Sequence, residues 1–407
     1  MIKNLRSNSV RGGRLNAGMD VPYRPLTSGA RGVPFALLPI GAEGTVMGEN
    51  PKGPTLEPTN IERFKEVVEA ERGKIWSIVV AQIDPDGVGS AMLLKLALES
   101  LGAEVAIFYG GTVGHPQNRT MFNHFELEKD FRLIADLPPE GPIALVDSSR
   151  YDDPRFGMSI AHARFKIVID HHHDPQIAGK NGKDRFMWVV SVGSASTLTA
   201  VLVKALGIKV DERTATCAAI GIHADTDKLV SEHTTPEDRT AFGEMMAVGS
   251  QEDFSVCCNY AWPQRYRALL VQTLNNCIEV DEYVIGHPTE LLRGDEGDLL
   301  SIIANHLKRH EGAHTVIVWG ISGGEIRASV RTSSRELNLS SLIADVFGKG
   351  AGGAKRGSGG ARIQIGNPFN PTENTAPEMI AYIGKTLIAR LESRVGVRQK
   401  PKVDNKD

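Results

Sequence analysis

Apolar runs and amphipathic stretches alternate along most of the chain, from about residue 59 onward. Short runs with few polar interruptions are typical of strands that a parallel sheet buries on both faces. Apolar residues that recur every three or four positions are typical of helices. The predicted strands are 74–82, 104–109, 141–147 and 165–170, and the predicted helices are 61–73, 90–101, 194–206 and 212–223. This alternation predicts an α/β domain with a parallel sheet and helices on both faces.

A second, smaller α/β domain is predicted in the C-terminal third of the chain. Its strands are expected at 315–322, 325–332 and 361–365, and its helices at 299–310, 340–347 and 378–391. A glycine-dense loop, GKGAGGAKRGSGG, is expected at 348–360. Residues 246–290 show no clear period, and we interpret them as helices that link two lobes.

These patterns divide the chain into five segments, with a cleft expected between the two folded domains. The first segment is rich in Gly, Pro, Arg and Asn and the last is polar, so both are expected to lack regular structure. The segments are an irregular arm (1–58), the larger α/β domain (59–245), a helical linker (246–294), the smaller α/β domain (295–392) and a disordered tail (393–407).

Composition narrows the class of protein only slightly. A net charge of −3 gives no general attraction to polyanions, so any phosphate affinity has to come from a local basic site. Four cysteines without a CxxC pair favour a reduced, intracellular protein over a disulfide scaffold or a zinc site. The N-terminus lacks the apolar core of a signal peptide, and no run reaches the roughly 18 apolar residues of a membrane span. We therefore expect a cytoplasmic protein without membrane contact.

Aspartates and histidines follow the apolar segments of the larger domain at four places. Asp84 and Asp86 come after the first predicted strand, and Asp147 ends the third. Asp170 ends the fourth and precedes three histidines, and Asp225 follows an apolar helix. Because the carboxyl ends of parallel strands lie at one edge of the sheet, these side chains are expected to converge. Carboxylate and imidazole ligands suit Mn²⁺ or Mg²⁺, and two such ions about 3.5–4 Å apart can clamp a phosphoryl group.

Each of these features also has a purely structural explanation. A single aspartate at a strand end usually caps a turn or a helix, a lone DxDG is a weak signal, and a triple histidine could be an exposed polar patch. All four features occur in order, each at the end of an apolar segment, and this combination favours a site. Asp147, alone at the end of a middle strand, suits the role of a carboxylate that bridges two ions.

The sequence around these residues resembles a known family. DPDGVGSA, ALVDSS, VIDHHHDP and GIHADTD look like motifs I to IV of the DHH phosphoesterase superfamily, in the right order. The intervening segments resemble the branch that contains nanoRNases and pAp phosphatases, and VRTSSRELNLSSLIADVFGKGAGG is similar to the DHHA1 substrate-binding domain. The resemblance covers roughly residues 60–245 and 295–390, and it implies a DHH catalytic domain followed by a smaller DHHA1-like domain.

Carried over motif by motif, the resemblance implies a role for each of these residues. Asp84 and Asp147 would hold one metal ion, and Asp147 would bridge to a second. The implied ligands of the second ion are Asp86, Asp147, His171 and Asp225. His172 would contact the scissile phosphate, and Asp170 would orient a ligand histidine from behind. Two ions, Mn²⁺ or Mg²⁺, are therefore expected in each active site.

Motif I departs from the pattern of many relatives, in which a His or Asp just before the paired aspartates is a further ligand of the first ion. Gln82 stands two residues before Asp84, and Val80 stands four residues before it. A neutral amide oxygen is a poorer ligand than a carboxylate or an imidazole. The first ion would then bind weakly, bind only together with substrate, or use His173 or His223, and the sequence leaves these alternatives open.

The glycine loop is the second departure, because it lacks the histidine that follows three glycines in the nanoRNase form. Lys349, Lys355 and Arg356 stand among its glycines instead. Backbone N–H groups of glycines can approach an anion closely, and nearby cations add charge-assisted hydrogen bonds. We therefore interpret the loop as a phosphate cradle rather than a flexible turn. The expected substrate contacts are Arg331, Gly350, Gly352, Gly353, Lys355, Arg356 and, by resemblance, Asn118.

Together these features predict a metal-dependent phosphoesterase that hydrolyses phosphate esters of short nucleotides with a metal-activated water. An oligoribonucleotide, pAp or a cyclic dinucleotide would fit a cleft between two lobes. The alternatives are a RecJ-like single-strand exonuclease or an exopolyphosphatase and, in another class, a non-catalytic nucleotide-binding regulator with a degenerate metal site. The sequence does not fix the substrate, the choice between Mn²⁺ and Mg²⁺, or whether the chain forms a homodimer.

Overall fold

The computed structural model describes most of the chain between residues 58 and 399. The described ranges are 58–150, 153–156, 164–172, 184–294, 296–310, 312–334, 336–355, 357–366, 371–372 and 374–399. The predicted irregular arm lies outside them except for residue 58, and so do residues 400–407 of the predicted tail. None of the helices in these ranges is both long enough and apolar enough to cross a bilayer.

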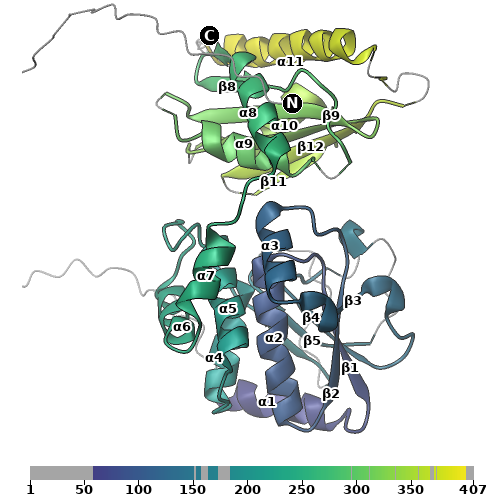
Figure 1. Ribbon diagram of the computed structural model, residues 1–407, viewed down its shortest axis with the longest axis vertical. Helices are drawn as coiled ribbons and strands as arrows, with labels where there is room; N and C mark the ends of the chain where they lie inside the picture. Colours follow the sequence, from purple (N-terminus) through teal and green to yellow (C-terminus); the bar gives the residue numbers. More distant parts are fainter. Residues whose placement is uncertain are drawn as a thin grey trace, which may run out of the picture. The chain divides into compact units, whose positions relative to one another are not determined.

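The N-terminal lobe is built on six parallel strands in the order β3-β2-β1-β4-β5-β6 (Figure 1). The strands are β1 (Ile75–Val80), β2 (Glu104–Tyr109), β3 (Phe131–Leu133), β4 (Pro142–Val146), β5 (Arg164–Asp170) and β6 (Phe186–Val189). The predicted parallel sheet is confirmed, and it contains two further short strands, β3 and β6, that were not predicted from the sequence. The strand order reverses between the neighbours β1 and β4. In such sheets ligands bind beyond the carboxyl ends of the strands at the point of reversal.

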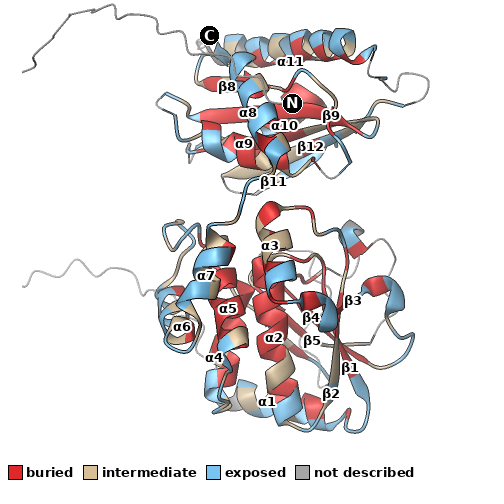
Figure 2. Ribbon diagram, viewed as in Figure 1, coloured by how far each residue is buried: buried red, intermediate tan, exposed pale blue. Residues whose placement is uncertain are grey.

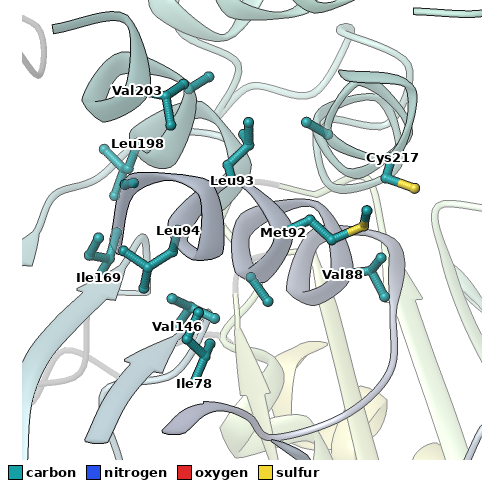
Figure 3. Packing of buried hydrophobic residues seen from close by; sticks show 14 of the residues in the cluster. Ile78, Val88, Met92, Leu93, Leu94, Val146, Ile169, Leu198, Val203 and Cys217 are labelled. Atoms are coloured by element: carbon teal, nitrogen blue, oxygen red, sulfur yellow. The ribbon is translucent and has the colours of Figure 1, made fainter. Parts of the chain in front are cut away.

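Helix α2 is the central helix of this lobe. The α-helices are α1 (Pro58–Glu69), α2 (Pro85–Ser100), α3 (Pro116–His124), α4 (Ala195–Ala205), α5 (Glu212–Asp225), α6 (Pro236–Met246) and α7 (Gln251–Cys258). Figure 3 shows α2 between the sheet on one side and α4 and α5 on the other. Leu93 and Leu94 of α2 belong to one buried cluster, which also contains Ile78 and Val146 of the sheet and Val203 of α4. This packing fixes the first turn of α2 above the ends of β1 and β4.

The other face of the sheet has a thinner cover in the described part of the chain. Phe108 and Leu145 of the sheet pack there with Ile134 and Phe156. Ile134 belongs to the 3-10 helix η2 (Ile134–Asp136), and Phe156 belongs to the 3-10 helix η3 (Pro154–Phe156). Both faces therefore bury apolar side chains, as a parallel sheet requires, but only one of them carries described α-helices.

The C-terminal lobe contains a second six-stranded sheet, in the order β11-β12-β10-β9-β8-β7. The strands are β7 (Ile278–Val280), β8 (Tyr283–Gly286), β9 (Thr315–Ser322), β10 (Glu325–Thr332), β11 (Gly352–Lys355) and β12 (Ser358–Gln364). β8 and β9 are parallel, and the other described pairs are antiparallel. Helices α10 (Leu339–Phe347) and α11 (Ala376–Gln399) cover one face, and α8 (Gln264–Asn275) and α9 (Leu299–Leu307) cover the other. Each lobe thus has its own buried core (Figure 2).

Three predictions for the C-terminal part of the chain were wrong. The segment 246–294 is not helical throughout, because β7 and β8 follow α8 and join the sheet next to β9. The glycine-rich segment 348–360 is not a loop but is largely a hairpin of β11 and β12. Residues 393–399 belong to α11 rather than to a disordered tail, and Arg394 of this helix pairs with Asp345 of α10. In each case contacts with distant parts of the lobe decide a conformation that the local sequence leaves open.

Candidate active site

Asp84 and Asp86 lie where β1 is followed by α2. Asp84 is the N-cap of α2, and its Oδ1 accepts a hydrogen bond from the Gly87 backbone N–H at 2.8 Å. Pro85 occupies the first helical turn, where its fixed φ suits a helix start. A Cβ at position 87 would lie 3.1 Å from Asp84 Oδ1 and from the Gln82 carbonyl oxygen, so glycine fits best there. The DPDG sequence therefore holds both aspartates at the carboxyl end of β1.

Asp86 is fully buried against the beginning of α4. Its Oδ2 accepts a hydrogen bond from the Ala195 N–H at 2.7 Å, and its Oδ1 accepts one from the Ser196 N–H at 2.8 Å. The carboxylate thus lies at the positive end of the α4 dipole, where backbone N–H groups bind an anion. Because each carboxylate oxygen has a second lone pair, Oδ2 can still bind a further group.

Asp147 and Asp170 are buried carboxylates at the ends of β4 and β5. Asp147 has a left-handed backbone with φ 53°, which is uncommon for a residue other than glycine and stores strain. Its Oδ1 is buried without a hydrogen-bond partner among the described residues. Asp170 Oδ1 accepts a hydrogen bond from the His172 N–H at 3.1 Å and lies 2.9 Å from His172 Nδ1. Backbone strain and an unpaired buried oxygen are typical of a functional position rather than of a simple turn cap.

His171 is the centre of the candidate site. Its Nδ1 lies 3.2 Å from the Val192 carbonyl oxygen, which can only accept, so Nδ1 carries the proton and Nε2 is left for another group. Nε2 lies 3.3 Å from Asp147 Oδ1, 3.4 Å from Asp225 Oδ2 and 3.6 Å from Asp86 Oδ2. It is buried, and none of these approaches has hydrogen-bond geometry. The three carboxylates that the resemblance assigns to the same ion therefore all approach His171 Nε2, and two of them, Asp86 and Asp225, form a group of mutually close ligand atoms with it.

Asp225 reaches this point because α5 crosses α2 at a very short distance. A Cβ at Gly89 of α2 would lie 2.7 Å from the Ala218 Cα, and one at Gly221 of α5 would lie 2.8 Å from the Pro85 carbonyl oxygen. Real side chains do not fit at such distances, so the crossing requires glycine at both positions. Asp225 is the last residue of α5 and is thereby brought next to the first turn of α2.

A strained turn directly after Asp225 was not foreseen from the sequence. Asp227, Lys228 and Leu229 have φ values of 46°, 64° and 65°, three successive left-handed residues without a glycine. The buried Thr226 holds this turn, since its Oγ1 donates to the Ile222 carbonyl at 2.5 Å and accepts from the Leu229 N–H at 3.0 Å. Such strain persists only where the surrounding structure enforces it, and it is concentrated at functional sites.

The charges of the site are strongly unbalanced. Burial and the neighbouring Asp84 raise the pKa of Asp147 well above its ordinary value. Burial lowers the pKa of His171, but Asp147, Asp86 and Asp225 outweigh it and raise the pKa to about 10. The carboxylates thus exceed the positive charge that His171 can supply. Carboxylate oxygens together with an imidazole nitrogen are ligands that suit Mn²⁺ and Mg²⁺, and the partnerless buried atoms fit such an ion.

The surroundings of Asp84 offer a less complete ligand set. One group of mutually close ligand atoms comes from Asp86, His171 and Asp225, and a second comes from Asp147, Asp170, His171 and His172. Asp84 belongs to neither group. The backbone carbonyl of Gln82 accepts a hydrogen bond from the Asp84 N–H at 3.1 Å. His223 faces Cys258 and two phenylalanine rings, and His173 lies outside the described residues.

Arg155 is a charged residue near Asp84 that no sequence pattern marks. Burial raises the pKa of Asp84, whereas the nearby charge of Arg155 lowers it. The Arg155 guanidinium also pairs with Asp153, with Nε 3.0 Å from Oδ1 and a terminal nitrogen 2.7 Å from Oδ2. The Gly111 N–H donates to the Arg155 carbonyl at 2.7 Å and holds η3 beside the end of β2. A cation thus lies next to the incomplete part of the site.

Asn118, an expected substrate contact, lies against the loop that carries Asp84. It is 5% exposed, and its Nδ2 donates to the Ile83 carbonyl at 2.7 Å. The side chain therefore supports this loop, and its contact with substrate stays a prediction.

Arg331 of β10 lines a pocket of about 350 Å³ in the C-terminal lobe. Arg327 and Arg362 contribute two more guanidinium groups to its walls. Arg331 Nε donates to Asn305 Oδ1 at 2.9 Å, and burial lowers the pKa of Arg331 from its ordinary value. Arg327 and Arg362 also pair with Glu325, at 3.1 and 3.4 Å, so the three guanidinium groups leave an excess of positive charge over that carboxylate, which suits an anionic group.

The glycines of the predicted cradle have mixed roles. Gly352 lines the same pocket, and a Cβ there would lie 1.9 Å from the Gly360 carbonyl oxygen, so the close approach of β11 and β12 requires glycine. Gly350 has φ 80° in the turn before β11, and Gly353 faces open space. The side chain of Lys355 and all of Arg356 lie outside the described residues. The hairpin therefore replaces the predicted loop as one wall of the pocket.

Comparison with known proteins identifies relatives of this chain. Residues 76–222 match the N-terminal domain of the DHH family. The chain is 24% identical over 341 residues to the uncharacterized protein MJ1633 of Methanocaldococcus jannaschii, a match that covers 84% of this chain and 68% of that protein. It is 30% identical over 200 residues to the bifunctional oligoribonuclease and PAP phosphatase NrnA of Thermus thermophilus. That match covers 47% of this chain and 56% of NrnA, little more than half of the relative.

The fold is also similar to a solved structure. An exopolyphosphatase-related protein from Bacteroides fragilis superimposes with a TM-score of 0.59, covering 83% of this chain and 98% of that chain at 16% identity. Identity as low as this shows a shared fold alone. The family match over residues 76–222 falls on the lobe in which all four motifs meet at the ends of a parallel sheet. This lobe is thus similar to the N-terminal domain of the DHH family over residues 76–222.

Proposed function

We propose that the chain is a metal-dependent phosphoesterase that hydrolyses phosphate esters of short nucleotides. The observation that carries the proposal is the convergence at His171, whose buried Nε2 lies within 3.6 Å of three carboxylates. Buried charges of one sign are costly unless a counterion binds among them. The match of residues 76–222 to the N-terminal domain of the DHH family supports phosphoester chemistry. The similarity to NrnA, named an oligoribonuclease and PAP phosphatase, supports a short nucleotide substrate.

The proposed ligands of one Mn²⁺ or Mg²⁺ ion all come from the four motifs. They are Asp86, Asp147, His171 and Asp225. A divalent cation bound there lowers the pKa of water and offsets the charge that develops on a phosphoryl group. The protein's part is to hold these side chains in place. The Val192 carbonyl fixes the ring of His171, and the first turn of α4 fixes both oxygens of Asp86.

His172 is proposed to contact the scissile phosphate, with Asp170 as its positioning residue. The resemblance implied that Asp170 orients a ligand histidine, but its carboxylate lies against His172 and not against His171. Burial raises the pKa of Asp170, but the hydrogen bond and charge of His172 bring it below its ordinary value. Asp170 therefore stays anionic and holds Nδ1 of His172. The His172 side chain is 39% exposed, so its ring is accessible to a phosphate of the substrate.

A second ion is proposed between Asp84 and Asp147. Asp84 belongs to no group of mutually close ligand atoms among the described residues, and Gln82 is a weak substitute ligand. We propose that phosphate oxygens of the substrate complete the shell of this ion, so that it binds together with substrate. Arg155, close to Asp84, adds positive charge at the same place.

The arginine pocket of the C-terminal lobe is proposed to bind a phosphate at the far end of the substrate. Arg327, Arg331 and Arg362 line it. A guanidinium group can donate two parallel hydrogen bonds to two oxygens of one phosphate. Gly352 brings the backbone of β11 to the wall of the same pocket. The predicted cradle residues Lys355 and Arg356 remain part of this proposal.

An Mn²⁺ assay across a panel of substrates tests the proposal. The panel comprises pAp, di- to pentaribonucleotides, cyclic di-AMP, single-stranded DNA and polyphosphate. We expect turnover of the short nucleotides that EDTA abolishes and that His171→Ala lowers by about a hundredfold or more. Asp136→Ala, which removes an exposed carboxylate of η2, is the matched control and is expected to keep full activity.

The same panel contains the outcomes that contradict the proposal. If the intact protein turns over none of these substrates with Mn²⁺ or Mg²⁺, the chain is better described as a non-catalytic nucleotide-binding regulator. Turnover confined to polyphosphate or to long single-stranded DNA would favour the exopolyphosphatase or RecJ-like alternative. Turnover that survives His171→Ala would show that the catalytic site has been assigned to the wrong residues.

A further inference from the structure

We propose that Tyr260, Trp262 and Tyr266 form a stacking platform for a nucleobase of the substrate. This inference rests on the proposed function and specifies which part of a nucleotide the protein recognises besides its phosphates. The three rings, called the aromatic platform below, lie in the segment NYAWPQRY between α7 and the first turn of α8. None of them belongs to the motifs that carry the candidate ion site.

Trp262 differs from the other tryptophans of the chain in its exposure. Trp76, Trp188 and Trp319 are 0%, 7% and 1% exposed, whereas Trp262 is 48% exposed. Scattered exposed apolar residues are normal, so exposure alone does not indicate a site. It does mean that Trp262 is the tryptophan whose ring a ligand from solution can reach.

The ring of Trp262 is held in place by its neighbours. It stacks on Tyr266 with a centroid distance of 4.6 Å and an interplanar angle of 23°, and Tyr260 meets it edge-on at 5.0 Å. Tyr266 is 8% exposed and packs in the core of α8 and α9. Pro263 follows directly and restricts the backbone at the start of α8. A ring supported on one face and half exposed is prepared to stack on a ligand with little loss of side-chain entropy.

Polar groups suited to a nucleotide surround the platform. The three rings line a pocket together with His115, His223 and Lys228, which can bond to phosphate or to base edges. His115 also packs edge-on against Tyr260 at 5.7 Å. A cation beside aromatic rings is the combination by which proteins bind single-stranded nucleic acids.

The platform pocket is connected to the candidate ion site through α5. Lys228 and Asp227 line the pocket, and they belong to the strained left-handed turn that follows Asp225 directly. Asp225, a proposed ion ligand, therefore lies just before the turn, and Asp227 and Lys228 of the turn line the aromatic pocket. A nucleotide whose base lies on Trp262 would have its phosphates next to this turn. This gives the strain of the turn a function, because the turn orients both parts.

Stacking on an aromatic ring makes a specific prediction about substrates. Every base has a π face, so stacking favours nucleotides over inorganic phosphates but distinguishes the four bases only weakly. The alternative is a purely structural role, in which the rings only pack the connection between α7 and α8. In that case replacing Trp262 would change stability without changing ligand affinity.

Tryptophan fluorescence in EDTA tests the proposal without any turnover. We expect triadenylate to quench the emission of the intact protein, and inorganic tripolyphosphate to leave the emission unchanged. Trp262→Phe is expected to lose the quenching, because the remaining tryptophans are buried, while equilibrium dialysis shows nearly unchanged triadenylate binding. Trp262→Ala is expected to bind triadenylate about fivefold or more weakly. Tyr382→Ala, which removes an aromatic side chain that is 73% exposed on α11, is the matched control and is expected to bind normally.

Three results would overturn the platform. Triadenylate that binds by dialysis without quenching the emission would show that no base reaches Trp262. Equal affinity of the intact protein and Trp262→Ala, with both variants folded by circular dichroism, would leave the rings a packing role. An equal loss of tripolyphosphate and triadenylate binding in Trp262→Ala would indicate a general disturbance. If the platform binds bases but no substrate is hydrolysed, only the proposed catalytic function fails.

Discussion

At the scale of single residues, the candidate site consists of carboxylates that approach the buried Nε2 of His171. The position of Asp147 after an apolar run was enough to expect it beside His171, because parallel strands end at one edge of the sheet. Its left-handed φ of 53° and its unpaired Oδ1 follow from packing that no sequence pattern records. The same holds for Arg155 and for the turn after Asp225, which lie in irregular segments. Asn118 was expected to contact substrate by resemblance, and its hydrogen bond to the Ile83 carbonyl adds a supporting role that the sequence did not reveal.

The variant Asp147→Asn tests whether Asp147 serves ion binding at the expense of the stability of the folded protein. Burial and Asp84 raise the folded-state pKa of Asp147 above its unfolded value, so ionised Asp147 destabilises the metal-free protein at pH 7. This cost is relieved as the pH falls through the raised pKa. We therefore expect the variant to have a higher Tm than the intact protein in EDTA at pH 7, and a difference that shrinks on acidification.

Calorimetry with and without MnCl₂ completes this test. Ion binding is expected to raise the Tm of the intact protein and to have little effect on Asp147→Asn, since ligands stabilise only the state that binds them. Asp136→Asn, on exposed η2, is the control and is expected to respond to MnCl₂ like the intact protein. This account of Asp147 would be contradicted if Asp147→Asn had a lower Tm than the intact protein in EDTA. It would also be contradicted if MnCl₂ raised the Tm of the variant as much as that of the intact protein.

At the scale of elements, long and strongly apolar segments were predictable and short or pairing-dependent ones were not. The strands at 104–109, 315–322 and 325–332 have the predicted bounds. α2 begins at Pro85 rather than at residue 90, because Asp84 caps a helix whose first turn contains proline and glycine. β3 has three residues and β7 has three, too few for a period to show. β11 and β12 are glycine-rich strands whose formation depends on their mutual pairing and on pairing with β10.

Helix α5 supplies a prediction at this scale, because it carries Asp225 at its C-terminal end. Asp211 is its N-cap and accepts a hydrogen bond from the Thr214 N–H at 2.9 Å. Asp211→Ala is expected to lower the free energy of unfolding by about 1 kcal/mol at pH 7, whereas Asp211→Asn keeps a capping oxygen and loses less. Urea unfolding followed by circular dichroism measures both.

The pH dependence of this cap follows from the pKa of Asp211. Burial raises that pKa, but the hydrogen bonds from Thr214 lower it below the ordinary value of 3.8. A lowered folded-state pKa means that the stabilisation is present above the unfolded pKa and is lost as the pH falls through the folded one. The difference between Asp211→Ala and the intact protein should therefore be full at pH 7 and smaller near pH 3. A difference that grows on acidification would show that Asp211 is not a charged cap.

At the scale of the whole molecule, the fold explains how residues from distant parts of the sequence form one site. α2, β4, β5 and the end of α5 each contribute a carboxylate or histidine, and the glycine crossing of α2 with α5 brings the last of them into reach. The parallel sheet and the smaller α/β lobe were predicted from alternation of apolar and polar segments. The pocket of Arg327, Arg331 and Arg362 could be anticipated only in part, because its hairpin wall depends on pairing across the second sheet.

Anomalous diffraction from crystals grown with MnCl₂ tests the central claim most directly. We expect a strong manganese peak bounded by Asp86, Asp147, His171 and Asp225, with ligand distances of about 2.0–2.4 Å. A second peak beside Asp84 is expected only when a nucleotide phosphate is also bound. No such peak should form in His171→Ala. Manganese that binds elsewhere, or an unfilled space among these four side chains at saturating MnCl₂, would contradict the proposal that they form a divalent-cation site.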